Sequence, residues 1–338
     1  MRLTIPLHLL RGAGLCGLLA CGTAHAQAGG GSVQLYGVID AAAGSFRDAG
    51  GSRSRQVSSG NMTTSYFGMR GREDLGGGLY ASFALESYFR GDTGASARFN
   101  GDSFFSRASN VGIGGQWGQL SLGRIGTPLF LHTLAYNPFG GSFAFSPAIR
   151  NTFQTTGRIA GDSAWNNAVG YKTANLSGVT GTLLYGLKET ARGPNASAAL
   201  QYIGEAFSAG LVGQKVEVPF AGGDQSTWQL GSSYDFGPAK AYGQYTRVRT
   251  SGTGTAAANT RDGIAQWGVA VPVGAGSLLA SWSQARTRGG QDIERTFGTV
   301  GYDHRLSRRT DAYVVLMGDR RTAVSSGRTF AVGIRHAF

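Results

Sequence analysis

Cysteine is almost absent from this chain, and the only two cysteines lie near its N-terminus. Cys16 and Cys21 both fall within residues 1–26, which have the features of a secretion signal. Once that segment is removed the chain has no thiol. We therefore expect no disulfide, no thiolate-bound zinc and no iron–sulfur cluster in the mature protein.

The signal is recognised by its charge, its short apolar run and its small final residues. Arg2 and Arg11 supply positive charge, residues 12–21 are apolar, and the sequence AHA at 24–26 predicts cleavage after residue 26. A lipoprotein signal is the alternative, because LLAC at 18–21 ends in a cysteine that could be lipidated. Leucine beside the small residue fits that alternative poorly. We predict a signal peptide at 1–26 and a single domain at 27–338, with no linker.

Long apolar runs and acidic residues are also scarce. No apolar stretch approaches the roughly 18 residues that a transmembrane helix needs. The chain has 19 acidic against 31 basic residues, a net charge of +12, of which Arg2 and Arg11 leave +10 on the mature chain. A basic soluble domain would suggest nucleic acid, but export removes that partner. In a channel the same charge would attract anions.

Groups that carry catalysis are few. After the signal the chain has three histidines, His132, His304 and His336, and none has a serine and an acid at plausible facing positions. Paired carboxylates and clusters of metal ligands are not evident. We therefore expect no enzyme, no catalytic residues, no metal and no cofactor.

Glycine is abundant, at 56 residues, and apolar and small residues alternate along much of the chain. The last nine residues, FAVGIRHAF at 330–338, show the pattern best, with one apolar face broken only by His336 and an aromatic carboxyl terminus at Phe338. This period of two predicts a strand, and an apolar face that needs lipid predicts a closed barrel in a bilayer. A soluble β-sandwich or solenoid is the alternative.

Sixteen alternating segments predict sixteen antiparallel strands. They lie at 33–43, 62–72, 79–90, 104–114, 119–125, 164–173, 179–189, 197–206, 209–218, 226–235, 239–249, 263–272, 276–287, 294–304, 310–320 and 328–338. Seven short turns alternate with longer polar connections, which is the expected layout of a transmembrane barrel with both termini on the short-turn side. The third long connection, residues 126–163, is far longer than the rest, and such a segment is usually functional.

Six segments, in order and with matching spacing, resemble the sixteen-stranded general porins of Gram-negative bacteria, in particular the β-proteobacterial branch. They are VQLYGVID at 33–40, SYFGMRGREDLG at 65–76, LSLGR at 120–124, NNAVGY at 166–171, the region 298–313 and the last strand. The resemblance covers the whole mature chain. It implies an outer-membrane homotrimer, in contact with membrane lipid and lipopolysaccharide, that passes small hydrophilic solutes. It also implies that the barrel assembly machinery reads Phe338 as an assembly signal.

In this family the third connection folds into the barrel and narrows it. The sequence NPFGG, Pro138, Phe139, Gly140 and Gly141 with the preceding asparagine, resembles the tip of that loop. Glycine there permits a positive φ, and proline fixes the φ before it. The loop also carries several aromatic residues, which either dock it against the wall or offer a stacking surface for solutes.

The resemblance further implies an arginine cluster on the wall of the constriction. Arg124 and Arg158 match two of the family's wall arginines, whereas Tyr66 stands where a third is expected. Arg70, on the same strand face as Tyr66 and nearer the short turn, could contribute.

The constriction loop departs from the family in charge. From Gly126 to Gly161 there is no Asp or Glu, and Arg150, Arg158 and His132 are the only ionisable side chains. Uncompensated wall arginines predict a preference for anions, which Asp40 on the first strand could partly offset.

Three functional readings stay open at this point: a general diffusion pore that prefers anions, a channel specific for phosphate or small carboxylates, and a non-conducting adhesin. The specific channel would need a ladder of basic side chains along the lumen. The remaining clustered arginines sit near strand ends, where contact with lipopolysaccharide or solvent is commoner; they are Arg247, Arg249, Arg286, Arg288, Arg305, Arg308 and Arg309.

Overall fold

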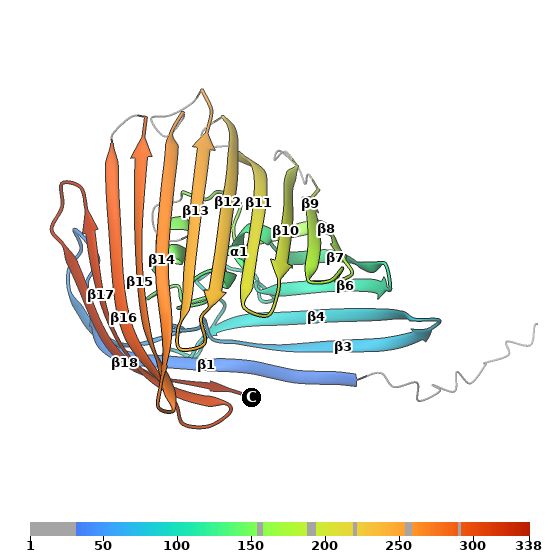
Figure 1. Cartoon of the computed structure of the whole chain (residues 1–338), viewed down its shortest axis with the longest axis horizontal. Coiled ribbons are helices and arrows are strands. Elements are labelled where there is room, and N and C mark those ends of the chain that lie inside the picture. The colour runs from blue at the N-terminus through green and yellow to red at the C-terminus, as the bar shows by residue number, and fades with distance from the viewer. Residues whose placement is uncertain (1–31, 154–157, 188–193, 219–221, 254–258, 290–291) are drawn as a thin grey trace, which may run out of the picture.

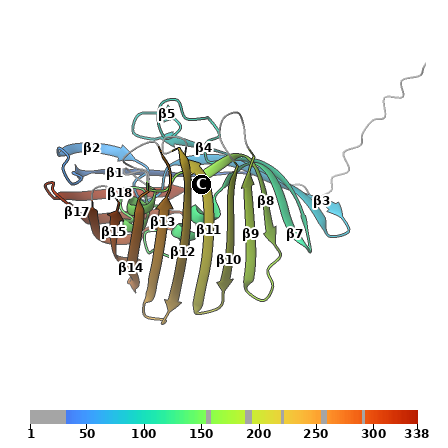
Figure 2. The same ribbon diagram turned by 90° about the horizontal axis from the view of Figure 1, so that it is seen from above.

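A computed structural model describes residues 32–153, 158–187, 194–218, 222–253, 259–289 and 292–338. The predicted signal peptide lies outside the described residues. The strands form one antiparallel sheet that closes on itself, since the first strand pairs with the last as well as with its sequence neighbours. Figures 1 and 2 show this wall of strands around a central space.

Sixteen long strands build the barrel, as predicted. They are β1 (Ser32–Phe46), β3 (Tyr66–Gly76), β4 (Leu79–Arg90), β6 (Ala108–Gly115), β7 (Gly118–Gly126), β8 (Ala164–Thr173), β9 (Val179–Gly186), β10 (Asn195–Ile203), β11 (Phe207–Val218), β12 (Gly223–Asp235), β13 (Lys240–Thr250), β14 (Arg261–Val273), β15 (Gly276–Arg288), β16 (Ile293–Arg305), β17 (Thr310–Arg321) and β18 (Gly327–Ala337). Two short strands, β2 (Ser54–Ser59) and β5 (Ala95–Ser96), lie in the first two outer connections.

Closure involves the C-terminal residue itself. The backbone of Phe338 exchanges two hydrogen bonds with Gly37 of β1, at 3.1 and 3.2 Å. A β-carbon on Gly37 would lie 2.5 Å from the Phe338 ring, so the glycine leaves space for that ring. The last side chain of the protein is therefore packed against the first strand.

The strands alternate between a polar inner face and an apolar outer face. On β12, Thr227 and Gln229 are buried inside, while Trp228 and Leu230 are exposed on the outside. Backbone groups pair between strands around the ring, so an apolar exterior of this kind can face lipid without unpaired polar groups. No helix among the described residues is long and apolar enough to cross a membrane.

The third outer connection lies inside the barrel. It contains α1 (Pro128–Ala135) and α2 (Pro147–Thr152), each with proline in its first turn and a hydroxyl cap, Thr127 and Ser146 respectively. Helix α1 packs against β9 to β12, and α2 packs against β14 to β16. Figure 1 shows α1 within the wall of strands. The expected inward fold of this loop is confirmed.

Strand β3 starts four residues later than predicted, and its shift has a physical cause. Residues 61–63 turn their backbone N–H groups toward the carboxylate of Asp40, which accepts from all three at 2.8–3.3 Å. These donors are used by a side chain and do not extend a strand. The following residues, from Tyr66, then pair with β1.

Candidate functional site

Arg124 stands on the inner wall at the end of β7, close to where the constriction loop begins. Its guanidinium donates to the carbonyl oxygens of Ser106 and Ala164, to the side chain of Asn166, and to the carboxylate of Asp162 at 3.0 Å. The side chain is only 11% exposed. Arg124 is therefore held rigidly at the wall, with its charge balanced by an acid.

Asp162 also joins the constriction loop to the second outer connection. Its carboxylate accepts two hydrogen bonds from Arg98, at 2.8 and 3.1 Å, in addition to the bond from Arg124. Arg98 in turn binds Asp102 at 2.8 Å. Burial alone raises the pKa of Asp162, but the hydrogen bonds and charges of Arg98 and Arg124 outweigh it and lower that pKa well below its usual range.

Tyr66 stands where a third wall arginine was expected, and the guanidinium of Arg107 lies beside its ring instead. Its guanidinium carbon lies 4.0 Å from the centre of the Tyr66 ring, and its Nε is 2.9 Å from the carboxylate of Glu86. The guanidinium also donates to the hydroxyl of Tyr88 at 3.3 Å. At 33% exposure the Arg107 side chain reaches the lumen. Sequence reasoning missed it, because Arg107 precedes β6 and approaches Tyr66 on β3 across the intervening strand β4.

Arg158 and Arg150 were predicted to face the channel, but both are buried. Arg158 is 5% exposed and binds Asp262 of β14 at 3.2 Å, while Arg150 is 6% exposed and binds Asp48 at 2.6 Å. Both link the constriction loop to the wall or to the first outer connection. The expectation that these loop and wall arginines are uncompensated is therefore wrong, since Arg124, Arg150 and Arg158 each have a carboxylate partner.

Asp40 is also placed differently from the prediction. It is fully buried, accepts the Tyr313 hydroxyl at 2.9 Å as well as the three N–H groups described above, and does not face the lumen. The hydroxyl of Ser142 on the constriction loop donates to the carbonyl of Asn61, at 2.6 Å. Asp40 thus holds the turn on which the loop rests, and it offsets no charge in the channel.

The predicted loop tip has the expected backbone. Gly140 has φ +48°, and a β-carbon at this position would have no neighbour within 4 Å. Asn137 stabilises the turn by donating to the carbonyls of Thr133 and Gly140 and by accepting from the N–H of Phe139. The ring of Phe139 is buried against the wall, so it docks the tip.

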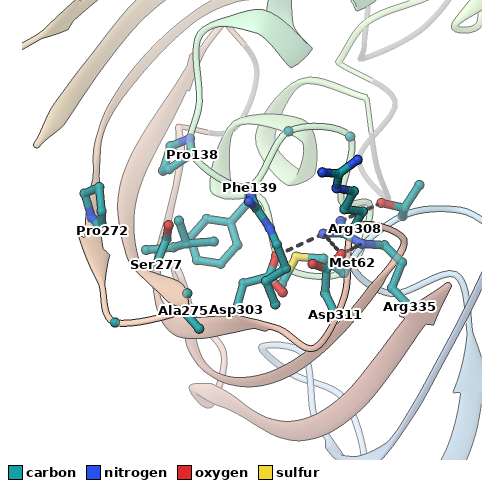
Figure 3. Close-up of a pocket in the computed structure, with 17 residues that line it drawn as sticks. Met62, Pro138, Phe139, Pro272, Ala275, Ser277, Asp303, Arg308, Asp311 and Arg335 are labelled. Atoms are coloured by element: carbon teal, nitrogen blue, oxygen red, sulfur yellow. Dashed lines mark hydrogen bonds and ion pairs between the residues drawn. The ribbon is translucent and has the colours of Figure 1, made fainter. Parts of the chain in front are cut away.

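Below the tip is a cavity of about 1160 Å³ that lies toward the short turns. Arg335 crosses its wall, binding Asp303 at 2.9 Å, Asp311 at 3.0 Å and the hydroxyl of Thr63 at 3.0 Å. Figure 3 shows Arg335, Asp303 and Asp311 on the same side of the cavity as Phe139 of the loop tip. Other lining residues include Gly140, Gly141, Arg305 and Arg308.

Charge differs between the constriction and the space below it. At the constriction three arginines face three acids: Arg98, Arg107 and Arg124 with Glu86, Asp102 and Asp162. On the inner face nearer the short turns, six basic side chains have no carboxylate within 4.0 Å among the residues that the structure describes. They are Arg70, Arg72, Lys172, Lys240, Arg305 and Arg308. Arg70 instead donates to the side-chain oxygen of Gln34.

Metal ligands do not gather anywhere in the described ranges, where no group of three or more His, Cys, Asp or Glu residues could hold an ion. The geometry of the inner wall is that of a passage. It is lined by ion pairs and by arginines that lie over tyrosine rings, and an inserted loop narrows it. A closed β-barrel with an apolar exterior and such a lumen defines an outer-membrane channel.

Comparisons with known proteins identify the family. A model of the Gram-negative porins matches residues 13–323. Outer membrane porin protein 32 of Delftia acidovorans is 31% identical over 95% of this chain and 97% of that protein, and a porin of Bordetella pertussis is 26% identical over 96% and 99%. The solved structure of an anion-selective porin from Comamonas acidovorans is 29% identical, with a TM-score of 0.77 over 91% of this chain and all of that one.

The chain belongs to the Gram-negative porin family. It is an outer-membrane porin, whose barrel forms a water-filled diffusion channel for small hydrophilic solutes and ions. The short turns accordingly face the periplasm and the long connections face outward.

Proposed function

We propose that this porin prefers anions, and that the preference arises mainly below the constriction. The observation that carries the proposal is the set of six inward basic side chains named above, which have no carboxylate partner among the described residues and lie on the periplasmic side of the loop tip. At the constriction, the ion pairs leave little net charge. A solved relative, the Comamonas acidovorans protein, is described as anion-selective, which supports the proposal.

The physical argument is one of concentration. Guanidinium and ammonium groups along a narrow aqueous passage raise the local concentration of anions and lower that of cations. Salt at about 0.1 M screens such charges over roughly 10 Å, so the groups act only on ions that pass close to them. Arg107, which is one-third exposed at the constriction, would then contact passing anions before they reach the wider basic region.

The test is the zero-current potential of the purified protein in a planar bilayer under a KCl gradient. An anion-selective potential that decreases when Arg305 and Arg308 are both changed to Gln supports the proposal. Cation selectivity of the unmodified protein would overturn it. Unchanged anion selectivity in the double variant would move its origin back to Arg107 and Arg124, and a second double variant at those positions would measure that contribution.

A channel specific for phosphate or small carboxylates is the second candidate. It is favoured by the cavity below the tip, where basic groups stand beside Phe139 and Pro138 and could bind both the charged and the apolar part of a small carboxylate. In that case single-channel chloride current should fall in the presence of millimolar phosphate or succinate. A general pore would show no such block.

The assembly of the porin is proposed on family grounds. We propose that the chain forms a homotrimer, that it contacts lipopolysaccharide in the outer leaflet, and that the barrel assembly machinery recognises its C-terminal Phe338. The packing of Phe338 over Gly37 supports a role for this residue in barrel closure. Three equal conductance steps per insertion would support the trimer.

A further inference from the structure

An arginine cluster lies on the outer surface of the barrel, at the extracellular ends of β13, β14 and β15. Its members are Arg247, Arg249, Arg261, Arg286 and Arg288. All five are exposed, and each lies on the strand face opposite to that of the buried inner residues. They point away from the channel, so its ion preference does not explain them.

The strand register places these charges directly against one another. Arg261 lies opposite Arg249 on one neighbouring strand and opposite Arg288 on the other, which gives a row of three guanidiniums. Like charges directly opposite in a sheet are destabilising unless something neutralises them. Within the described residues the cluster has one carboxylate partner, Glu294, which is 3.0 Å from Arg286. Four of the five cations therefore lack a neutralising group.

A hollow separates the arginines of the next row. Gly263 lies between Arg247 and Arg286 in the register, and a cavity of about 570 Å³ is formed over it. The only atoms that a β-carbon at Gly263 would meet belong to the Tyr245 ring, with the hydroxyl oxygen nearest at 3.2 Å. The site thus has room for a group larger than a water molecule, with guanidiniums on several sides.

Directly toward the membrane from the cluster is an aromatic belt on the same outer face. Tyr245, Trp267 and Trp282 are 41%, 65% and 39% exposed on β13, β14 and β15. Tyrosine and tryptophan gather at the level of lipid headgroups. The arginine cluster therefore stands at the height of the outer-leaflet headgroups, with acyl chains below it.

We propose that this arginine cluster binds the phosphate groups of an outer-leaflet glycolipid of the lipid A type. Guanidiniums bind phosphate bidentately, and several of them around one hollow suit a headgroup with more than one phosphate. A lipid-borne phosphate is favoured over a free one because the site continues into the aromatic belt on the lipid-facing side. This rests on, and deepens, the proposed contact with lipopolysaccharide by assigning it to named residues.

The test measures binding of bisphosphorylated lipid A to the full barrel in detergent, by native mass spectrometry. The variant is Arg261→Gln with Arg288→Gln. Its control is Arg308→Gln with Arg309→Gln, which removes the same charge at the periplasmic edge. We expect the first variant to lose at least tenfold in affinity and the control to stay within twofold of the unmodified protein. Equal binding by all three would overturn the site.

Two further probes separate the remaining readings. Dephosphorylated lipid A should bind the unmodified protein no better than it binds the variant, and equal affinity for both forms of the lipid would refute recognition of phosphate. Inorganic phosphate that binds as tightly as the lipid, and is lost in the same variant, would overturn the commitment to a lipid. If the unmodified protein binds no lipid A at all, the proposed lipopolysaccharide contact fails together with the site. Lipid binding that the variant does not weaken removes only the site.

The variant itself needs two checks. The zero-current potential of Arg261→Gln with Arg288→Gln should match that of the unmodified porin, because these side chains lie outside the channel. A changed potential would contradict their assignment to the outer surface. If the Gln variant does not fold, Arg261→Lys with Arg288→Lys keeps the charge and removes the bidentate geometry, and a severalfold loss of lipid A affinity is then expected. Full affinity in the Lys variant would overturn the guanidinium site.

Discussion

Gly210 and Gly231 lie directly opposite each other on β11 and β12, on the inner wall where helix α1 rests. A β-carbon at Gly231 would come within 2.4 Å of the Tyr136 ring and 2.8 Å of the His132 ring. One at Gly210 would come within 2.8 Å of His132. The glycine pair thus leaves the space against which α1 packs, and the position of the constriction loop depends on this contact.

Gly231→Ala should therefore displace α1 and alter the channel. We expect a changed single-channel conductance and a loss of about 1–3 kcal/mol of stability, the usual cost of overpacking a close contact. Gly213→Ala is the control on β11, since nothing lies within 4 Å of a β-carbon there. Conductance and unfolding by denaturant are the two measurements. Identical behaviour of both variants would show that α1 does not depend on close packing against this glycine pair.

The sequence predicted the barrel well because its signals are local. Alternation identifies each strand without knowledge of its neighbours, and the sixteen segments were found with boundaries shifted by a few residues. The ion pairs were not predictable in that way. Arg158 meets Asp262 and Arg150 meets Asp48 across about a hundred residues of chain, and only the inward fold of the constriction loop brings them together.

The charge of the constriction was misjudged for a related reason. The acid-free part of the loop ends at Gly161, and the next residue, Asp162, is the one that neutralises Arg124. Arg107 was missed because its partner Tyr66 belongs to a strand that is not its sequence neighbour. Both errors concern residues, Asp162 and Arg107, that lie outside the segments from which the constriction was predicted.

Asp162→Asn should strengthen anion preference. The change leaves Arg98 and Arg124 without their shared carboxylate, so the wall gains positive charge. The zero-current potential under a KCl gradient should move further toward the anion limit. Asp224→Asn, which breaks an exposed pair with Lys215 on the outer face, is the matched control and should leave the potential unchanged. A shift toward cations in Asp162→Asn would contradict the assignment.

The same pair predicts how the constriction responds to acid. The lowered pKa of Asp162 means that its ion pairs add stability above the unfolded pKa of about 4, and that this contribution is lost only as the pH falls through the lower folded value. Ion selectivity should therefore stay constant as the pH is lowered from 7 to about 4. In Asp162→Asn it should show no pH dependence from this group at all. A rise in anion selectivity near pH 5 in the unmodified protein, absent from Asp162→Asn, would refute the lowered pKa of Asp162.

Arg158→Gln should act on the loop, because its side chain is buried. Removing the cation leaves Asp262 buried without its ion-pair partner, and breaking a buried pair in this way costs about 3–5 kcal/mol. Combining it with Asp262→Asn removes the unpaired charge and should recover much of that loss. Chemical denaturation of the single and double variants measures both effects. Additive destabilisation would mean that the two residues do not act as a pair.

His132 predicts a second response to pH, with its origin in burial. Burial lowers the pKa of this imidazole, and its bond to Gln229 only partly opposes that effect. The fold therefore favours the neutral ring. The contribution to stability is complete above the unfolded pKa of about 6.5 and declines as the pH falls from there toward the folded value. His132→Asn should remove this slope between pH 7 and 5, as followed by denaturation. An unchanged slope would assign it to another group.

Charged substitutions on the two faces of the strands test which face contacts lipid. Val332 is 51% exposed on β18, on the face opposite to the buried Ala331. Val332→Arg places a charge in lipid, and should cost about 2–4 kcal/mol near the bilayer midplane. Ser121→Arg adds the same charge on β7, where the side chain faces inward and lines a cavity of about 340 Å³. Refolding into lipid vesicles should be impaired by the first change and nearly unaffected by the second. The opposite order would require the strand faces to be reversed.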